Sequence, residues 1–240
     1  MRLIPETLKR GFEALLTPVV GRLIAARVNP NGITTVGTAL LVAAGVAFGY
    51  GMARLGGGLL LASGVADMLD GRVARGRGGT SAFGAFYDST LDRVGEAALL
   101  GGIVISFMQG GVPDQWRVIA VSLALTALGA GLIVSYTRAR AEGLGLECKV
   151  GIAQRAERIL GIGVPTLFFG TGPNGYLLLA IVALLALINA VTVLQRIAHV
   201  YRETRQVEPL MRDTRAAARD TQARRIAPEL AEYLGKGRNR

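Results

Sequence analysis

The sequence predicts an all-α fold: an integral membrane bundle of six transmembrane helices preceded by an interfacial amphipathic helix. One observation is composition, since 51% of the 240 residues are hydrophobic and only 18% are charged. The other is length, because apolar runs of the ~20 residues that a helix needs to cross a bilayer recur along the chain. Short breaks rich in Gly, Pro and Asn separate these runs.

The amino-terminal segment, residues 1–28, is predicted to contain the interfacial helix, over residues 5–26. Large apolar side chains recur at helical spacing, at Leu8, Phe12, Leu15, Val19 and Leu23. The charged side chains lie on the other faces of the helix, at Lys9, Arg10, Glu13 and Arg22. This amphipathic pattern, with basic residues on the polar face, is typical of a helix lying in the membrane interface.

The six membrane spans are predicted within a catalytic domain over residues 29–204. The breaks between them are Gly-Pro-Asn turns or polar connections, and the spans are residues 33–53, 56–75, 82–109, 115–142, 153–170 and 176–203. The remaining residues, 205–240, are polar and rich in Arg and Ala, which predicts a basic cytoplasmic tail.

The charge distribution predicts the orientation of the bundle. Lys and Arg gather at the amino end, at residues 72–77, between the fourth and fifth spans and after residue 195, whereas the opposite connections hold only Arg54 and Arg117. The excess of cations on the cytoplasmic side of membrane proteins places both termini there, in a multi-pass protein of the cell (inner) membrane whose active site faces the cytoplasm. The net charge of +10 is therefore assigned to membrane lipids and phosphorylated substrates, and no nucleic-acid partner is expected.

Four carboxylates interrupt the second and third spans. Asp67 and Asp70 lie three residues apart, and Asp88 and Asp92 lie four apart, so each pair shares one helix face. An unpaired Asp near the middle of a membrane helix costs about 2.5 to 3.5 kcal/mol, which predicts shared cations. Oxygen ligands in this number suit one or two Mg²⁺ or Mn²⁺ ions.

Two functions use such buried carboxylates. An ion-coupled transporter would use them as a proton or ion pathway. A phosphate-transferring enzyme is favoured here, because Arg75 can bind phosphate in bidentate fashion and because Gly71 and Gly84 remove side chains where a ligand would approach. Gly84 also has a simpler explanation, since small residues are common packing devices between membrane helices.

These residues carry a resemblance. The pattern Asp67-x2-Asp70-Gly71-x2-Ala74-Arg75-x8-Gly84-x3-Asp88-x3-Asp92 matches in full the signature of the CDP-alcohol phosphotransferase family. The resemblance implies transfer of the phosphatidyl group of CDP-diacylglycerol to an alcohol with release of CMP, by a protein that is commonly a homodimer.

The resemblance also implies the roles of individual residues. Asp67, Asp70 and Asp88 would be metal ligands, and Asp92 would be the base that takes the acceptor proton and would contact a second metal. The residues that would surround the CDP-lipid are Gly71, Ala74, Arg75 and Gly84, with Thr80 near the diphosphate and with Asn31 and Thr34 near the nucleotide.

The acceptor is predicted from three arginines at the same membrane face. Arg138 lies near the end of the fourth span, and Arg155 and Arg158 open the fifth. Their surroundings are similar to those in the phosphatidylinositol-phosphate synthases of the family, which implies inositol 1-phosphate as the acceptor. Arg138 stands where that subgroup has Lys, and Ala156 where it has Pro, so a phosphatidylglycerolphosphate synthase using glycerol 3-phosphate remains the alternative. Each of these arginines, taken singly, could also serve only to hold its loop on the cytoplasmic side of the membrane.

Overall fold

The computed structural model describes residues 6–79, 81–151 and 155–205, and the regular elements in these ranges are all helices. Their bounds are α1 Glu6–Ala25, α2 Pro30–Gly49, α3 Ala53–Gly76, α4 Ala82–Ser106, α5 Asp114–Gly143 and α6 Arg155–Phe169, with short turns of helix at Phe107–Gly111 and Pro173–Gly175. A last helix, called here the C-terminal helix, covers residues 176–205. The predicted helices are all present, and the all-helical class is confirmed.

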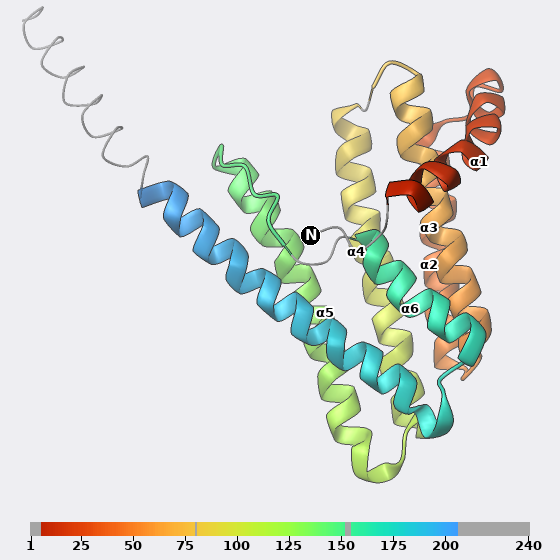
Figure 1. The fold of residues 1–240 in the computed structure, drawn as a ribbon, viewed down its shortest axis with the longest axis vertical. Coiled ribbons are helices and arrows are strands. Elements are labelled where there is room, and N and C mark those ends of the chain that lie inside the picture. Colours follow the sequence, from red (N-terminus) through yellow and green to blue (C-terminus); the bar gives the residue numbers. More distant parts are fainter. Residues whose placement is uncertain (1–5, 80, 152–154, 206–240) are drawn as a thin grey trace, which may run out of the picture.

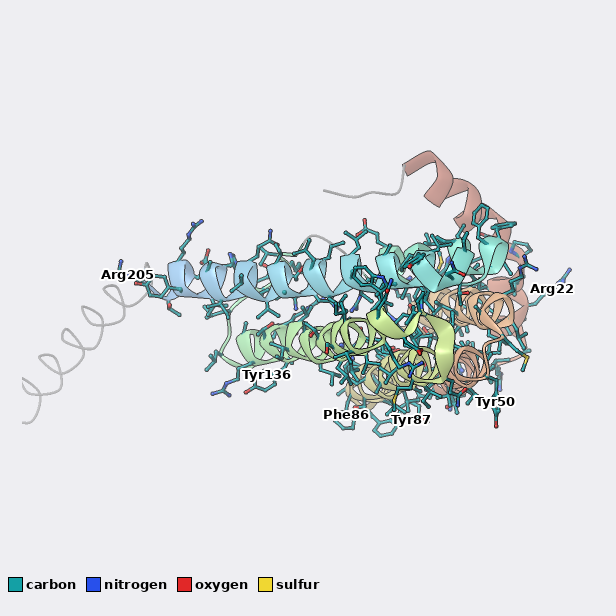
Figure 2. The ribbon with its side chains drawn as sticks, turned by 90° about the horizontal axis from the view of Figure 1, so that it is seen from below. Arg22, Tyr50, Phe86, Tyr87, Tyr136 and Arg205 are labelled. Atoms are coloured by element: carbon teal, nitrogen blue, oxygen red, sulfur yellow. The ribbon has the colours of Figure 1, made fainter. Side chains whose placement is uncertain are left out.

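Three of these helices are long and apolar enough to cross a membrane, namely α2, α5 and the helical segment Pro173–Arg205. The perimeter of the bundle is apolar as well. Tyr50, Phe86 and Tyr136 are 65% to 76% exposed, and they point away from the helices (Figure 2). An outer surface of this kind is favourable in lipid, where no water has to be ordered around it. The structure therefore supports a membrane protein.

The helices run up and down, so that their connections gather at two ends (Figure 1). The α3–α4 and α5–α6 connections lie at the same end as α1, and the α2–α3 and α4–α5 turns lie at the other. Within the bundle, α2 packs against both α3 and α4, while α6 packs against α3 and α5 against α4. Helix α2 is thus the common neighbour of the two helices that carry the four aspartates.

The contact between α2 and α4 depends on glycine. A Cβ atom added at Gly102 would overlap the carbonyl oxygen of Gly45, and one added at Gly45 would overlap the carbonyl of Ala98. Two helix backbones approach this closely only where side chains are absent, which is the usual role of small residues in membrane bundles. The buried side chains of Leu41, Phe48 and other apolar residues fill the core around this contact.

We expect Gly102→Ala to lower the apparent melting temperature of the purified protein in detergent by several degrees. The added methyl group has no space, and overpacking of this kind costs about 1 to 3 kcal/mol. Gly101→Ala is the matched control, since no atom lies within 4 Å of the Cβ position at Gly101. Equal melting temperatures for the two variants would contradict the close α2–α4 contact.

Candidate active site

The connection between α3 and α4 is built from residues suited to a tight turn. Gly78 and Gly79 have φ angles of 103° and 115°, which side-chain-bearing residues rarely adopt. Ser81 then caps α4, because its hydroxyl accepts a hydrogen bond from the Gly84 N–H at 2.9 Å. The turn brings the start of α4 back toward the end of α3. Thr80, which was predicted to lie near the diphosphate, falls outside the described residues.

Three of the four aspartates form a compact group. Asp67, Asp70 and Asp88 each offer one carboxylate oxygen, and these oxygens all lie within 4.8 Å of one another. Opposite ligands of an octahedral Mg²⁺ ion are about 4.2 Å apart, twice the usual metal–oxygen distance of ~2.1 Å. One oxygen of Asp88 is buried and makes no hydrogen bond within the described part of the chain. The donor set and this unpartnered oxygen therefore fit a divalent cation.

Thr34 lies on α2 where this helix packs against α3. Its hydroxyl donates a 2.8 Å hydrogen bond to Asp70 Oδ2 across the α2–α3 contact, and both side chains are buried. This bond orients the Asp70 carboxylate, so Thr34 supports the aspartate group directly. Its predicted contact with the nucleotide stays a prediction.

The other residues assigned to the CDP-lipid lie around the same end of α3 and α4. The Arg75 guanidinium folds back over Gly71, where an added Cβ would lie 3.4 Å from Arg75 Nη1. The side-chain oxygen of Asn31 lies 3.3 Å from the corresponding position at Gly84. The space left by the missing side chains of Gly71 and Gly84 is thus partly filled by the side chains of Arg75 and Asn31. Ala74 is buried.

Asp92 and the predicted acceptor arginines form ion pairs. Arg155 donates a 2.7 Å hydrogen bond to Asp67 Oδ1, and the same guanidinium nitrogen pairs with Asp92 Oδ1. Arg158 pairs with Glu96 Oε1 at 2.6 Å. Arg138 pairs with Glu142 on its own helix at 2.8 Å, and both side chains are half exposed. The structure therefore brings Arg155 to the aspartates and holds Arg158 one turn of α4 further along.

The structure adds Arg196, which the sequence did not single out as a site residue. It lies on the C-terminal helix, donates from Nε to the Val150 carbonyl at 3.0 Å, and donates from Nη1 to the Val134 carbonyl. Arg138 and Arg158 both lie close enough to interact with it electrostatically. In the sequence, Arg196 is a basic residue at the end of an apolar run of about 20 residues. The same pattern is typical of a residue that only holds the end of a membrane helix on the cytoplasmic side.

A small cavity of about 40 Å³ opens beside Asp92. Its polar wall consists of Asp92, Arg93, Glu96, Arg155 and Arg158, and its apolar wall comes from leucines and isoleucines of α2, α3, α4, α6 and the C-terminal helix. Carboxylates that fit a metal, a further carboxylate beside a cavity and a group of arginines thus occupy one end of the bundle. This arrangement can hold a metal-bound diphosphate next to a hydroxyl and a second phosphate.

Comparisons with known proteins agree with this chemistry. The sequence matches the CDP-alcohol phosphatidyltransferase family over residues 27–201. It is 37% identical to the phosphatidylinositol phosphate synthase of Cutibacterium acnes, over 82% of this chain and 97% of that protein. It is 42% identical to the archaetidylinositol phosphate synthase of Methanothermobacter thermautotrophicus, over 69% and 80% of the two chains.

Solved structures show the same likeness. The structure resembles the crystal structure of Mycobacterium tuberculosis phosphatidylinositol phosphate synthase with CDP-DAG bound, with a TM-score of 0.68 and 30% identity over 78% of this chain and 94% of that one. The same enzyme in complex with manganese and citrate gives a TM-score of 0.67 at 31% identity, over 77% and 88%. By its sequence, its fold and its carboxylate group, this chain belongs to the CDP-alcohol phosphatidyltransferase family.

Proposed function

We propose that this protein transfers the phosphatidyl group of CDP-diacylglycerol to inositol 1-phosphate, giving phosphatidylinositol phosphate and CMP. The observation that carries the proposal is that residues suited to the donor and residues suited to the acceptor lie together at one end of the bundle. The compact group of Asp67, Asp70 and Asp88 suits the diphosphate of the donor. Arginines that can bind an acceptor phosphate lie beside Asp92. The relatives described above are named for this class of reaction.

The donor half of the site is assigned to α3 and the start of α4. Asp67, Asp70 and Asp88 would hold Mg²⁺ or Mn²⁺, with Thr34 orienting Asp70. A divalent ion bound there would neutralise the negative charge that develops on the departing CMP. Arg75, beside Gly71, supplies a fixed positive charge for the diphosphate, and Asn31 and Gly84 border the nucleotide.

Asp92 is assigned the proton transfer. Its carboxylate lines the cavity where the acceptor would lie, and a base within hydrogen-bond reach of the attacking hydroxyl removes its proton as the new phosphate ester bond forms. Arg155 holds the carboxylates of Asp92 and Asp67 on one guanidinium nitrogen, which leaves its other N–H groups available to an acceptor phosphate. Direct attack of the hydroxyl on the phosphatidyl phosphorus is the mechanism that these positions favour. A role of Asp92 at a second metal stays a prediction.

The acceptor phosphate is assigned to Arg138, Arg155, Arg158 and Arg196. They come from three different helices, and Arg196 lies near both Arg138 and Arg158. Guanidinium groups pair with phosphate oxygens in bidentate fashion, so several of them around one point favour an acceptor that is itself phosphorylated. This is the physical reason to prefer inositol 1-phosphate or glycerol 3-phosphate over an uncharged alcohol.

The membrane arrangement belongs to the same proposal. In this proposal the interfacial helix lies within residues 1–28, and residues 29–204 form a catalytic domain whose six helices all cross the inner membrane. The cytoplasmic tail predicted over residues 205–240 lies, apart from Arg205, outside the described residues. The site faces the cytoplasm, since the end of the bundle that carries it also carries most of the Lys and Arg. Gly129 has open space around its Cβ position on α5, and it would permit close packing in a homodimer.

The test is an assay of CMP release by the purified protein. CDP-diacylglycerol and Mn²⁺ are supplied with inositol 1-phosphate, with glycerol 3-phosphate or with inositol. We expect turnover with inositol 1-phosphate at a kcat/KM at least about 10-fold above that with either alternative, a difference of about 1.4 kcal/mol. Turnover with glycerol 3-phosphate alone would refute the inositol assignment, and no CMP release with any acceptor would refute the enzymatic function.

A further inference from the structure

Glu96 is a buried carboxylate of α4 to which the proposed reaction gives no role. Its side chain is 16% exposed, and its Oε1 atom accepts a 2.6 Å hydrogen bond from Arg158 Nη1 of α6. Its Oε2 atom lies 3.8 Å from Arg93 Nε on its own helix, and these two groups also form an ion pair. A buried charge is costly unless it is paired, so Glu96 and the two arginines hold one another in place.

A glycine on α5 leaves the space that this carboxylate occupies. A Cβ atom added at Gly131 would lie 2.9 Å from Glu96 Oε1 and 3.3 Å from Asn189 Nδ2 of the C-terminal helix. Asn189 is itself 3% exposed, and its amide donates a 3.0 Å hydrogen bond to the Ala127 carbonyl. The Glu96 carboxylate therefore lies between the backbone of α5 and the guanidinium of Arg158, with little freedom to move.

Arg158 has a competing partner beside the same cavity. Arg158 and Asp92 both line the cavity of about 40 Å³, so a guanidinium released from Glu96 would find the Asp92 carboxylate nearby. That pairing would draw the guanidinium away from an acceptor phosphate. In the structure Glu96 uses one nitrogen of Arg158, Nη1, and the remaining N–H groups of this guanidinium can bind phosphate oxygens.

We infer that Glu96 is a positioning residue for acceptor binding, which keeps Arg158 available to the acceptor phosphate by preventing its pairing with Asp92. Gly131 in turn leaves the space that fixes Glu96. The inference rests on the proposed function, since that function assigns Arg158 to the acceptor phosphate. It predicts that acceptor binding depends on the shape and hydrogen bonding of residue 96 more than on its charge.

The test compares Glu96→Ala with Glu96→Gln, with KM measured separately for inositol 1-phosphate and for CDP-diacylglycerol. Glu96→Ala should raise the KM for inositol 1-phosphate by about 10- to 100-fold, because a misplacement of about 1 Å can cost 100-fold, and it should leave the KM for CDP-diacylglycerol unchanged. Glu96→Gln keeps an oxygen that accepts from Arg158, so both of its KM values should stay within about threefold of the wild type.

Gly131→Ala moves the same carboxylate without changing any charged group. The added methyl group meets the flexible end of Glu96 first, so the protein should fold and the KM for inositol 1-phosphate should rise by about 3- to 10-fold. Gly101→Ala is the matched control, because it adds the same methyl group to a helix where no atom lies within 4 Å, and its KM values should equal those of the wild type.

A double-mutant cycle measures whether Glu96 acts through Arg158. In an Arg158→Ala background, Glu96→Ala should change the KM for inositol 1-phosphate by less than about threefold, because the group that Glu96 positions is gone. A general loss of structure would lower activity in both backgrounds alike.

The inference is overturned by any of three results. One is an equal change of KM in Glu96→Ala and Glu96→Gln, in either direction, since both variants remove the charge. Another is an equal rise of KM for both substrates in Glu96→Ala. The third is a full effect of Glu96→Ala without Arg158.

The proposed function is tested by the wild type alone, before any variant is compared. Turnover with glycerol 3-phosphate but not with inositol 1-phosphate would refute the inositol assignment. The same KM comparisons then use glycerol 3-phosphate, which also carries a phosphate for Arg158, and they decide the role of Glu96 separately.

Discussion

Asp92→Asn should reduce kcat by about 10²- to 10⁴-fold, the usual contribution of a positioned general base, while leaving the affinity for CDP-diacylglycerol within about threefold. The amide keeps the size of the side chain but cannot take the proton of the acceptor hydroxyl. Asp92 lies outside the group of three aspartates that fits the metal, so donor binding should survive. The measurements are single-turnover CMP release at saturating acceptor and equilibrium binding of CDP-diacylglycerol.

Asp114→Asn is the matched control for that experiment. Asp114 is an exposed aspartate at the start of α5, paired with Arg117 at the end of the bundle opposite the site, and its replacement should leave kcat unchanged. Unchanged CMP release in Asp92→Asn would exclude Asp92 as the base. A parallel loss of Mn²⁺ affinity in that variant would assign Asp92 to the metal site instead.

Asp88→Asn should weaken Mn²⁺ binding by at least about 100-fold and abolish turnover at ordinary metal concentrations. One Asp88 oxygen is buried without a hydrogen-bond partner in the described residues, and a bound divalent cation would satisfy it. Loss of even an indirect supporting contact of a metal site costs about 10- to 100-fold in affinity, and loss of a direct ligand should cost more. Titration of Mn²⁺, followed by its electron paramagnetic resonance signal, measures the change.

Ser89→Ala is the control for the metal experiment. Ser89 is the exposed neighbour of Asp88, and within the described residues its hydroxyl donates to the Phe86 carbonyl of its own helix. Addition of a chelator to the wild type should stop CMP release, and Mg²⁺ or Mn²⁺ should restore it. Equal Mn²⁺ affinity in Asp88→Asn and the wild type would remove Asp88 from the metal site.

Much of the donor half of the site is local in sequence, and local features are predictable. Helical periodicity places Asp67 with Asp70, and Asp88 with Asp92, on shared faces, and the glycines before Ser81 mark the turn between α3 and α4. The helix ends follow from the turn residues and from the length of the apolar runs. Both the all-helical class and the family were therefore available from the sequence.

The rotation of α3 and α4 about their axes was not available in this way. Helix α2 packs against both of them. The angle and rotation of each helix depend on which side chains are absent at the contacts, such as those at Gly45 and Gly102. The hydrogen bond from Thr34 to Asp70 is a consequence of this packing.

The sequence by itself determined the family and its donor chemistry, because the aspartates, Gly71 and Arg75 that make up the signature lie within two helices and one turn. Only the tertiary structure decided what surrounds the acceptor. Arg155 reaches Asp67 across 88 positions of the chain and Arg158 reaches Glu96 across 62, while Arg196 of the last helix lies within electrostatic range of Arg158. Periodicity determines which residues share a face of one helix, but the direction of that face is set by packing against other helices.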